Sequence, residues 1–168
     1  MAIGTLSRNV RVSEEYQKLA EEDEQIARLL HSQYRYRHAI YFTLQAMEKF
    51  VRARIFRLAD PFDPEVISNQ RHHSVDEAIK FLFKAIKDPD ILKQVKEQLN
   101  KYFPPDINYA QLHNDVRYPF ISQNRYNSLT VEYADAEEMM RRLGFLKEFL
   151  KGVDITLEEE ERKRRSRR

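Results

Sequence analysis

The residues with the clearest chemical potential in this 168-residue chain form the run His113-Asn114-Asp115-Val116-Arg117-Tyr118-Pro119. If residues 110–117 are helical, His113 and Arg117 lie one turn apart on one face. An imidazole that titrates near neutral pH can move the 2′-hydroxyl proton of RNA, while a guanidinium stabilises the pentavalent phosphate. The run is therefore a candidate for RNA cleavage without a metal ion. The alternative is an exposed helix end on which Arg117 pairs with Asp115.

A second stretch, Tyr34-Arg35-Tyr36-Arg37-His38, alternates aromatic rings with basic side chains. Such an arrangement holds a phosphate with a guanidinium while a base stacks on a ring. The alternative is that the two tyrosines pack between helices and the arginines are solvated. From the two stretches together we predict six ligand-binding residues: Arg37, His38, His113, Asn114, Arg117 and Tyr118.

Composition excludes several kinds of site. The chain has no cysteine, which excludes disulfide scaffolds, thiolate zinc sites, iron–sulfur clusters and cysteine nucleophiles. Its three glycines are too few for a P-loop or a glycine-rich dinucleotide-binding loop. None of the five histidines follows a glutamate by three residues, as a carboxylate-bridged di-iron bundle requires. The pair His72-His73 lacks an acidic residue in the turn before it and is interpreted as solvated or capping. We expect no bound metal and no cofactor.

The net charge of +2 comes from the C-terminal segment. Residues 162–168 carry six basic side chains, and Glu158 to Glu161 are four consecutive acids, whereas residues 1–157 contain 23 basic and 23 acidic residues. The segment either extends the last helix, with pairs such as Glu158–Arg162 and Glu160–Arg164, or is a disordered basic tail that binds RNA non-specifically. The balanced remainder gives no indication of a basic nucleic-acid-binding face.

No apolar run approaches the roughly 20 residues that span a bilayer, and the N-terminus lacks a secretory apolar core. We therefore expect a cytoplasmic protein that does not contact membranes.

The apolar periodicity predicts an all-α fold, an up-and-down bundle of about five helices. We expect the first helix to begin with Ser13 as its cap, and the second to span residues 35–58. Ser74 should cap the third in a capping box with Glu77, and the fourth should follow the Asp88-Pro89-Asp90 break. The last should run over about 131–151, from a Thr130 cap to Gly152 as its stop. Residues 106–130 are the least regular, and no strand alternation is evident.

Two apolar stripes run along residues 35–58, which indicates the central helix of the bundle, and Gln45, Glu48, Lys49 and Arg52 mark its polar side. We divide the chain into an N-terminal extension (1–12), a helical domain (13–152) and a charged C-terminal tail (153–168).

The central helix also carries a family resemblance. The segment Tyr36-Arg37-His38-Ala39-Ile40-Tyr41-Phe42-Thr43-Leu44-Gln45-Ala46-Met47-Glu48-Lys49 resembles the second helix of HEPN domains, named for higher eukaryotes and prokaryotes nucleotide-binding. A histidine that introduces the third helix is typical of the family, and His73 before Ser74 fits. Arg117-Tyr118-Pro119 matches the Arg-Tyr-Pro that precedes the family's last helix. The order of these features covers about residues 16–151.

The resemblance implies a homodimer. It also implies one of three roles: a ribonuclease that needs no metal, often a toxin or an antiphage defence protein; an inactive domain; or the companion of a small nucleotidyltransferase. Ribonuclease members carry an arginine, four to six residues and then a histidine, whereas no arginine lies five, six or seven positions before any histidine here. The missing motif favours a non-enzymatic protein.

We therefore expect a dimeric module that binds a nucleotide, RNA or a partner protein, in a toxin–antitoxin or defence system with a nucleotidyltransferase. One alternative is a divergent metal-independent endoribonuclease that uses His113 and Arg117. The other is a purely structural interaction protein.

Overall fold

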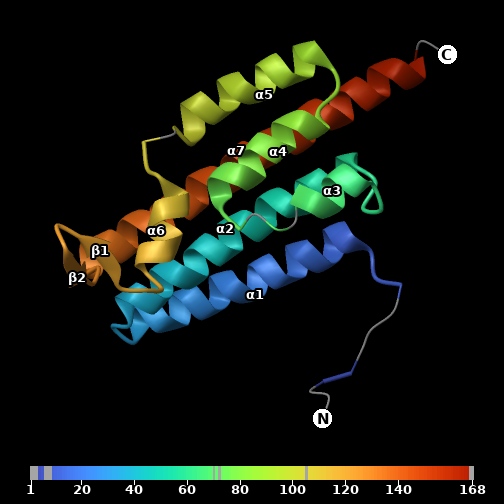
Figure 1. The fold of residues 1–168 in the computed structure, drawn as a ribbon. Helices are drawn as coiled ribbons and strands as arrows, with labels where there is room; N and C mark the ends of the chain where they lie inside the picture. The colour runs from blue at the N-terminus through green and yellow to red at the C-terminus, as the bar shows by residue number, and fades with distance from the viewer. Residues whose placement is uncertain (1–3, 6–8, 70, 72, 105, 167–168) are drawn as a thin grey trace.

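Seven helices and one β-hairpin make up the described part of the chain (Figure 1). The structure, a computed structural model, describes residues 4–5, 9–69, 71, 73–104 and 106–166, and only the backbone of residues 160, 161, 163 and 164. The elements are α1 Val12–Ser32, α2 Tyr36–Leu58, α3 Pro64–Asn69, α4 Val75–Ala85, α5 Pro89–Tyr102, α6 Tyr109–Asp115, β1 Phe120–Ser122, β2 Arg125–Asn127 and α7 Tyr133–Ser166. The predicted all-α bundle is confirmed, and its five predicted helices correspond to α1, α2, α4, α5 and α7.

Helix α2 is the centre of the bundle. Thirteen of its 23 residues are buried, which requires neighbours around most of its circumference. It packs against α1, α4, α6 and α7, while α5 packs on α7 instead (Figure 1). The two apolar stripes of this helix therefore both face the core.

Two charged residues in the middle of α1 pair with side chains of neighbouring helices. Asp23 pairs with Lys49 of α2, and Glu24 pairs with Arg28 in its own helix at 2.7 Å and with Lys147 of α7 at 2.8 Å. The polar residues in the middle of α1 thus face other helices, and they set the position of α1 across both α2 and α7.

Side-chain caps define two helix starts in the middle of the chain: the predicted one at Ser74, and one at Asp88 within the predicted break. The Ser74 hydroxyl accepts a hydrogen bond from the Glu77 amide at 3.2 Å, so the predicted cap of α4 is confirmed. The Asp88 carboxylate accepts from the amides of Asp90 and Ile91 at the start of α5, where Pro89 takes the first helical position.

Other boundaries differ from the prediction. Helix α1 begins at Val12, and its cap residue Arg11 makes no side-chain capping bond, so Ser13 lies inside the helix. Helix α7 begins at Tyr133, three residues after the predicted Thr130 cap, and the Asp135 carboxylate accepts from the Glu132 amide there.

The sequence does not predict α3 or the β1–β2 hairpin, and it considers a helix at α6 only as a condition, over residues 110–117. The hairpin turns at Gln123 and Asn124, which both have positive φ, at 53° and 58°. A two-residue turn of this kind is usually signalled by Asn-Gly or Asp-Gly, and this chain lacks that signal. Helices of six or seven residues likewise carry little local information of their own.

Gly152 does not end the last helix. Helix α7 continues through it to Ser166, and its last turns project past the neighbouring helices (Figure 1). A Cβ at Gly152 would lie 2.8 Å from Gln98 Oε1 of α5, so the missing side chain lets the two helices approach closely. The backbone of residues 153–166 is therefore helical. The side chains of the predicted pair Glu160–Arg164 lie outside the described residues.

Candidate functional site

Arg37, in the first turn of α2, holds the segment between α6 and α7 with its guanidinium group. Nε donates to the Val116 carbonyl at 2.8 Å, and Nη2 donates to the Asp115 carbonyl at 3.2 Å. Nη1 donates to Ser128 Oγ at 2.8 Å and to the Leu129 carbonyl at 3.4 Å. The partners are 78 to 92 residues away in the sequence, so Arg37 fixes the end of α6 against the start of α2.

His113, in the last turn of α6, is 4% exposed and packs against α2. Its ring meets the Tyr41 ring edge to face, with centroids 5.9 Å apart. Its Nε2 lies 3.2 Å from Arg117 Nη1 and 3.5 Å from Gln45 Nε2. Since both neighbours are N–H donors, Nε2 accepts, which assigns the ring proton to Nδ1.

The surroundings of His113 keep it uncharged. Burial, together with the positive charge of Arg117, lowers the pKa of His113 below its ordinary value, although the carboxylate of Glu48 acts in the opposite direction. The imidazole is therefore neutral at pH 7.

Arg117 lies one turn beyond His113, as the spacing predicted, and its guanidinium is exposed. Nη2 donates to the hydroxyl of Tyr118 at 2.8 Å. The guanidinium carbon lies 4.8 Å from the ring centre of Tyr118 and 5.9 Å from that of Tyr41. We call Tyr41, Gln45, His113, Arg117 and Tyr118 the α2–α6 cluster. It presents a positive charge and aromatic rings at one surface.

A second pair of residues lies on the same face of α2. The Glu48 carboxylate, one turn after Gln45, accepts from Arg52 Nε at 2.7 Å, and both of these side chains are buried. His73 Nδ1 lies 3.3 Å from the same carboxylate oxygen, while the His73 side chain is 68% exposed. A carboxylate on Nδ1 orients the ring and leaves Nε2 as the acceptor. We call this the His73–Glu48 pair.

The remaining predicted residues occupy the same end of the bundle. His38 is exposed in the first turn of α2, and Asn114 is exposed in the last turn of α6. Tyr36 packs on the rings of His31 and Tyr133, with centroids 5.6 and 5.9 Å away, as the interhelical alternative predicted for it. Tyr34 is instead 79% exposed and has a positive φ of 61°. His72 lies outside the described residues.

The residues that the structure describes include no group of three or more His, Asp or Glu side chains that could hold a metal ion. None of the helices in this part of the chain is long and apolar enough to cross a membrane.

Comparison with known families matches the HEPN domain over residues 13–154, which is most of the chain. The chain belongs to the HEPN domain family. No curated protein and no solved structure matches it. The HEPN match includes α2, α4 and α6, and hence both the α2–α6 cluster and the His73–Glu48 pair.

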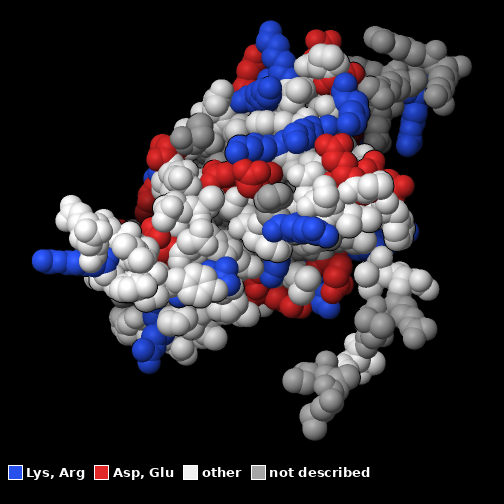
Figure 2. Space-filling model, viewed as in Figure 1, with Lys and Arg blue, Asp and Glu red and all other residues white. Residues whose placement is uncertain are grey.

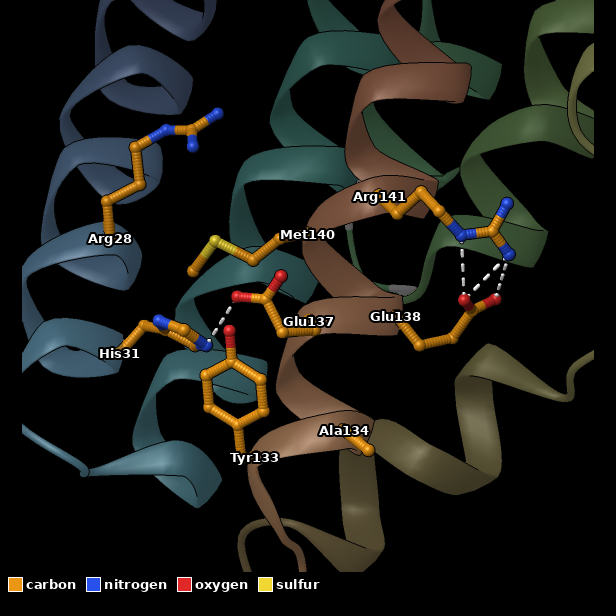
Figure 3. A pocket seen from close by; sticks show the side chains of 8 residues that line it. All are labelled: Arg28, His31, Tyr133, Ala134, Glu137, Glu138, Met140 and Arg141. Carbon is orange, nitrogen blue, oxygen red and sulfur yellow. Dashed lines mark hydrogen bonds and ion pairs between the residues drawn. The ribbon is translucent and has the colours of Figure 1, made fainter.

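A separate groove on this HEPN domain lies between the end of α1 and the start of α7 (Figure 3). His31 Nε2 lies 2.9 Å from a carboxylate oxygen of Glu137, whose negative charge also raises the pKa of the Tyr133 phenol. The two arginines at the rim are paired as well: Arg28 with Glu24, and Arg141 with Glu138. Because its charges are already paired, this groove offers a ligand less electrostatic attraction than the α2–α6 cluster does.

Sequence reasoning missed the His73–Glu48 pair as a unit. The periodicity places Glu48 on the polar side of α2, and His73 stands out only as a feature typical of the family. The two residues are 25 positions apart, so no helical spacing links them. The sequence did offer one signal for the pair: Glu48 is a carboxylate on the helix that is predicted to be the centre of the bundle.

Proposed function

We propose that this HEPN domain binds nucleotides or single-stranded RNA at the α2–α6 cluster. The observation that carries the proposal is the exposed guanidinium of Arg117, which lies beside the rings of Tyr118 and Tyr41. The predicted ligand-binding residues His38 and Asn114 are exposed at the same end. In this proposal Arg37 acts by positioning α6, since its guanidinium is bonded to the segment after it.

The cluster matches the two chemical parts of a nucleotide. The contacts to His113 and Tyr118 use two of the five N–H donors of Arg117, which leaves donors for phosphate oxygens. Tyr118 is 54% exposed and supplies a face on which a base can stack. His113 contacts Arg117 and has a lowered pKa, so it is neutral and does not repel the guanidinium.

The surface charge supports a local site. On the face shown in Figure 2, acidic and basic side chains alternate and form no continuous basic patch. RNA bound to such a surface depends on a few specific contacts, in contrast to a protein that holds the backbone along a long basic track.

The test is fluorescence anisotropy of a labelled single-stranded RNA titrated with the full-length protein. We expect Arg117→Ala to weaken binding about ten-fold, because it removes both the phosphate contact and the cation that orients Tyr118. Arg141→Ala is the matched control, because Arg141 is an exposed arginine that pairs with Glu138 in the other groove. Equal affinities for the wild type and Arg117→Ala would reject the site.

The His73–Glu48 pair supports a second candidate, metal-independent RNA cleavage. In this reaction His73 Nε2 takes the proton of the 2′-hydroxyl, the 2′-oxygen attacks phosphorus, and the 5′-oxygen leaves with a proton from water. Glu48 orients the imidazole and stabilises the imidazolium ion, and Arg117 stabilises the charge on the phosphate. The base expected from the sequence, His113, is less suited, because its Nε2 already faces two donors.

A gel assay on total RNA with excess chelator separates binding from cleavage. Cleavage by the wild type that is lost in both His73→Ala and Arg117→Ala would establish the ribonuclease. If His113→Ala alone abolishes cleavage and His73→Ala does not, the pair of His113 and Arg117 carries the reaction. An inert wild-type protein that still binds RNA leaves the binding module as the function.

We also propose that the protein acts as a homodimer, with a nucleotidyltransferase partner in a toxin–antitoxin or defence system. The support is membership of the HEPN family. Multi-angle light scattering of the purified protein tests the dimer, and a mass equal to one chain, 20.2 kDa, would reject it. Co-purification with a nucleotidyltransferase encoded by a neighbouring gene tests the proposed partnership.

A further inference from the structure

An apolar groove lies between α4 and α5, on the part of the domain that the proposed function does not use. Its volume is about 340 Å³. Apolar and aromatic side chains, among them Phe83, Leu99, Phe103 and Tyr109, line much of it, together with the charged Lys80 and Lys96. A cavity of this size and character falls within the range of small-molecule sites in proteins.

The helix packing explains why the groove exists. Helix α4 packs on α2, whereas α5 packs on α7, so the two consecutive helices are held by different neighbours on either side of the short link that joins them (Figure 1). Phe103 and Tyr109 stack at 5.2 Å and 18° and help line the groove. The Tyr109 hydroxyl accepts a hydrogen bond from Arg142 Nη1 at 3.3 Å, so Tyr109 contributes mainly its apolar ring to the groove.

The charges at the rim favour an anion. Lys96 Nζ lies 5.6 Å from the ring centre of Phe83, and Lys96 forms no ion pair with any side chain that the structure describes. Lys80, on the opposite helix, pairs with Glu77 at 2.7 Å. The acid at the rim, Asp76, accepts a hydrogen bond from the Ala110 amide at 2.9 Å. Lys96 is thus the cation that a ligand can pair with most readily.

We propose that this groove binds a small amphipathic anion: a flat apolar or aromatic body with a carboxylate that pairs with Lys96. The body would lie against Phe83 and Leu99, where it removes apolar surface from water, and the carboxylate would remain at the open rim. A polar nucleotide is a poor match for these apolar walls, so the groove and the α2–α6 cluster have different ligands.

The chain has no tryptophan, so a single introduced tryptophan reports on its own surroundings. We would place one in the groove (Phe83→Trp) and, as a control, one on the exposed loop after α2 (Phe62→Trp), where the native side chain is 83% exposed. The probe is 4-phenylbutanoate, an aromatic carboxylate that does not absorb tryptophan emission. We expect a saturable change in emission for Phe83→Trp and none for Phe62→Trp.

The role of Lys96 is tested by charge. In wild-type protein, ligand-detected NMR should show that 4-phenylbutanoate binds about three-fold more tightly than the uncharged 4-phenylbutan-1-ol, the difference expected of an exposed ion pair. Lys96→Glu should remove this preference for the acid and leave the affinity for the alcohol unchanged. Lys93→Glu changes an exposed charge on the same helix outside the groove, so it should preserve the preference.

Three outcomes would overturn the proposal. The first is that neither probe binds the wild type saturably. The second is that the wild type binds the acid and the alcohol with equal affinity. The third is that Lys96→Glu and Lys93→Glu lose the preference for the acid equally. The NMR arm uses the native Phe83, so it decides the proposal even if Phe83→Trp does not fold.

Discussion

At the scale of single residues, burial and neighbouring donors decide what each histidine can do. His113 is buried, and its Nε2 faces Arg117 and Gln45, so it serves as a neutral acceptor that holds Arg117 in place. His73 is mostly exposed and is oriented by a buried carboxylate. Of the two, His73 has the environment of a proton carrier, although the sequence drew attention to His113.

His113 should make the domain less stable in mild acid. Its pKa is lowered in the folded state, so the unfolded chain binds more protons once the pH falls below the unfolded value of about 6.5. Stability is therefore unaffected above that value and is lost as the pH falls through it toward the folded pKa. We expect urea unfolding to show a smaller loss between pH 7.5 and 5 for His113→Gln than for the wild type. Parallel pH profiles for the two proteins would contradict the neutral, buried assignment.

Arg37 should be a large contributor to stability for a polar residue at the domain surface. Its guanidinium bonds three carbonyls and a hydroxyl in the segment after α6, so Arg37→Ala leaves partly buried acceptors without a donor. We expect a loss of about 2–3 kcal/mol in the free energy of unfolding. Arg35→Ala, two residues earlier and exposed, is the control and should change it by less than about 0.5 kcal/mol. Urea unfolding measures both, and equal effects would contradict the positioning role.

At the scale of helices, α7 is longer than its sequence suggests because a glycine inside it serves packing. Gln98 of α5 lies against Gly152, and Gln98 Nε2 donates to Thr156 Oγ1 one turn later at 3.2 Å. Glycine is tolerated there because the tertiary contact outweighs its low helix propensity. The same helix contains Gly144, which has no atom within 4 Å of the position of a Cβ.

The two glycines should respond differently to alanine. Gly144→Ala should raise the free energy of unfolding by about 0.5–1 kcal/mol, because alanine restricts the unfolded chain and meets no neighbour in the folded one. Gly152→Ala should raise the free energy of unfolding by less than Gly144→Ala does, or lower it, because the new Cβ would push the Gln98 side chain aside. Thermal unfolding of both variants measures the difference. A gain at Gly152 equal to that at Gly144 would contradict the packing role.

At the scale of the whole molecule, the net charge is separate from the proposed site. Residues 1–157 carry equal numbers of acidic and basic residues, so the net charge comes from the residues after them. The described backbone of that segment is helical to Ser166 and projects past the bundle (Figure 1). Val153 is buried and Leu157 packs on the core, so the contacts of α7 with the domain extend at least to Leu157. In the proposed RNA-binding function, we therefore expect the C-terminal turns and the α2–α6 cluster to contribute independently.

Deleting residues 158–168 should lower general polyanion affinity and leave the fold intact. Removing six basic charges should weaken heparin binding and flatten the dependence of RNA affinity on salt. The Arg117→Ala effect should persist in the shortened protein, and circular dichroism should show an unchanged melting transition within a few degrees. Loss of the cooperative transition on deletion would show that these residues belong to the folded domain.

Local sequence patterns by themselves determined much of this protein. The two stripes of α2 and the Ser74 cap depend on residues within one or two turns, and each appears in the fold as predicted. The order of these local features was also enough to indicate the HEPN family. Helical periodicity and capping are properties of neighbouring residues, so they can be read from the chain.

Only the tertiary structure decided which residues come together at the candidate site. It brought His73 to Glu48, bound Arg37 to carbonyls 78 or more residues away, and turned Gly152 from an expected stop into a contact with α5. It also formed α3, α6 and the hairpin, whose few residues carry weak local signals. The physical reason is the same throughout. Periodicity and capping are local, whereas burial, pKa and hydrogen-bond partners depend on segments that become neighbours only when the chain has folded.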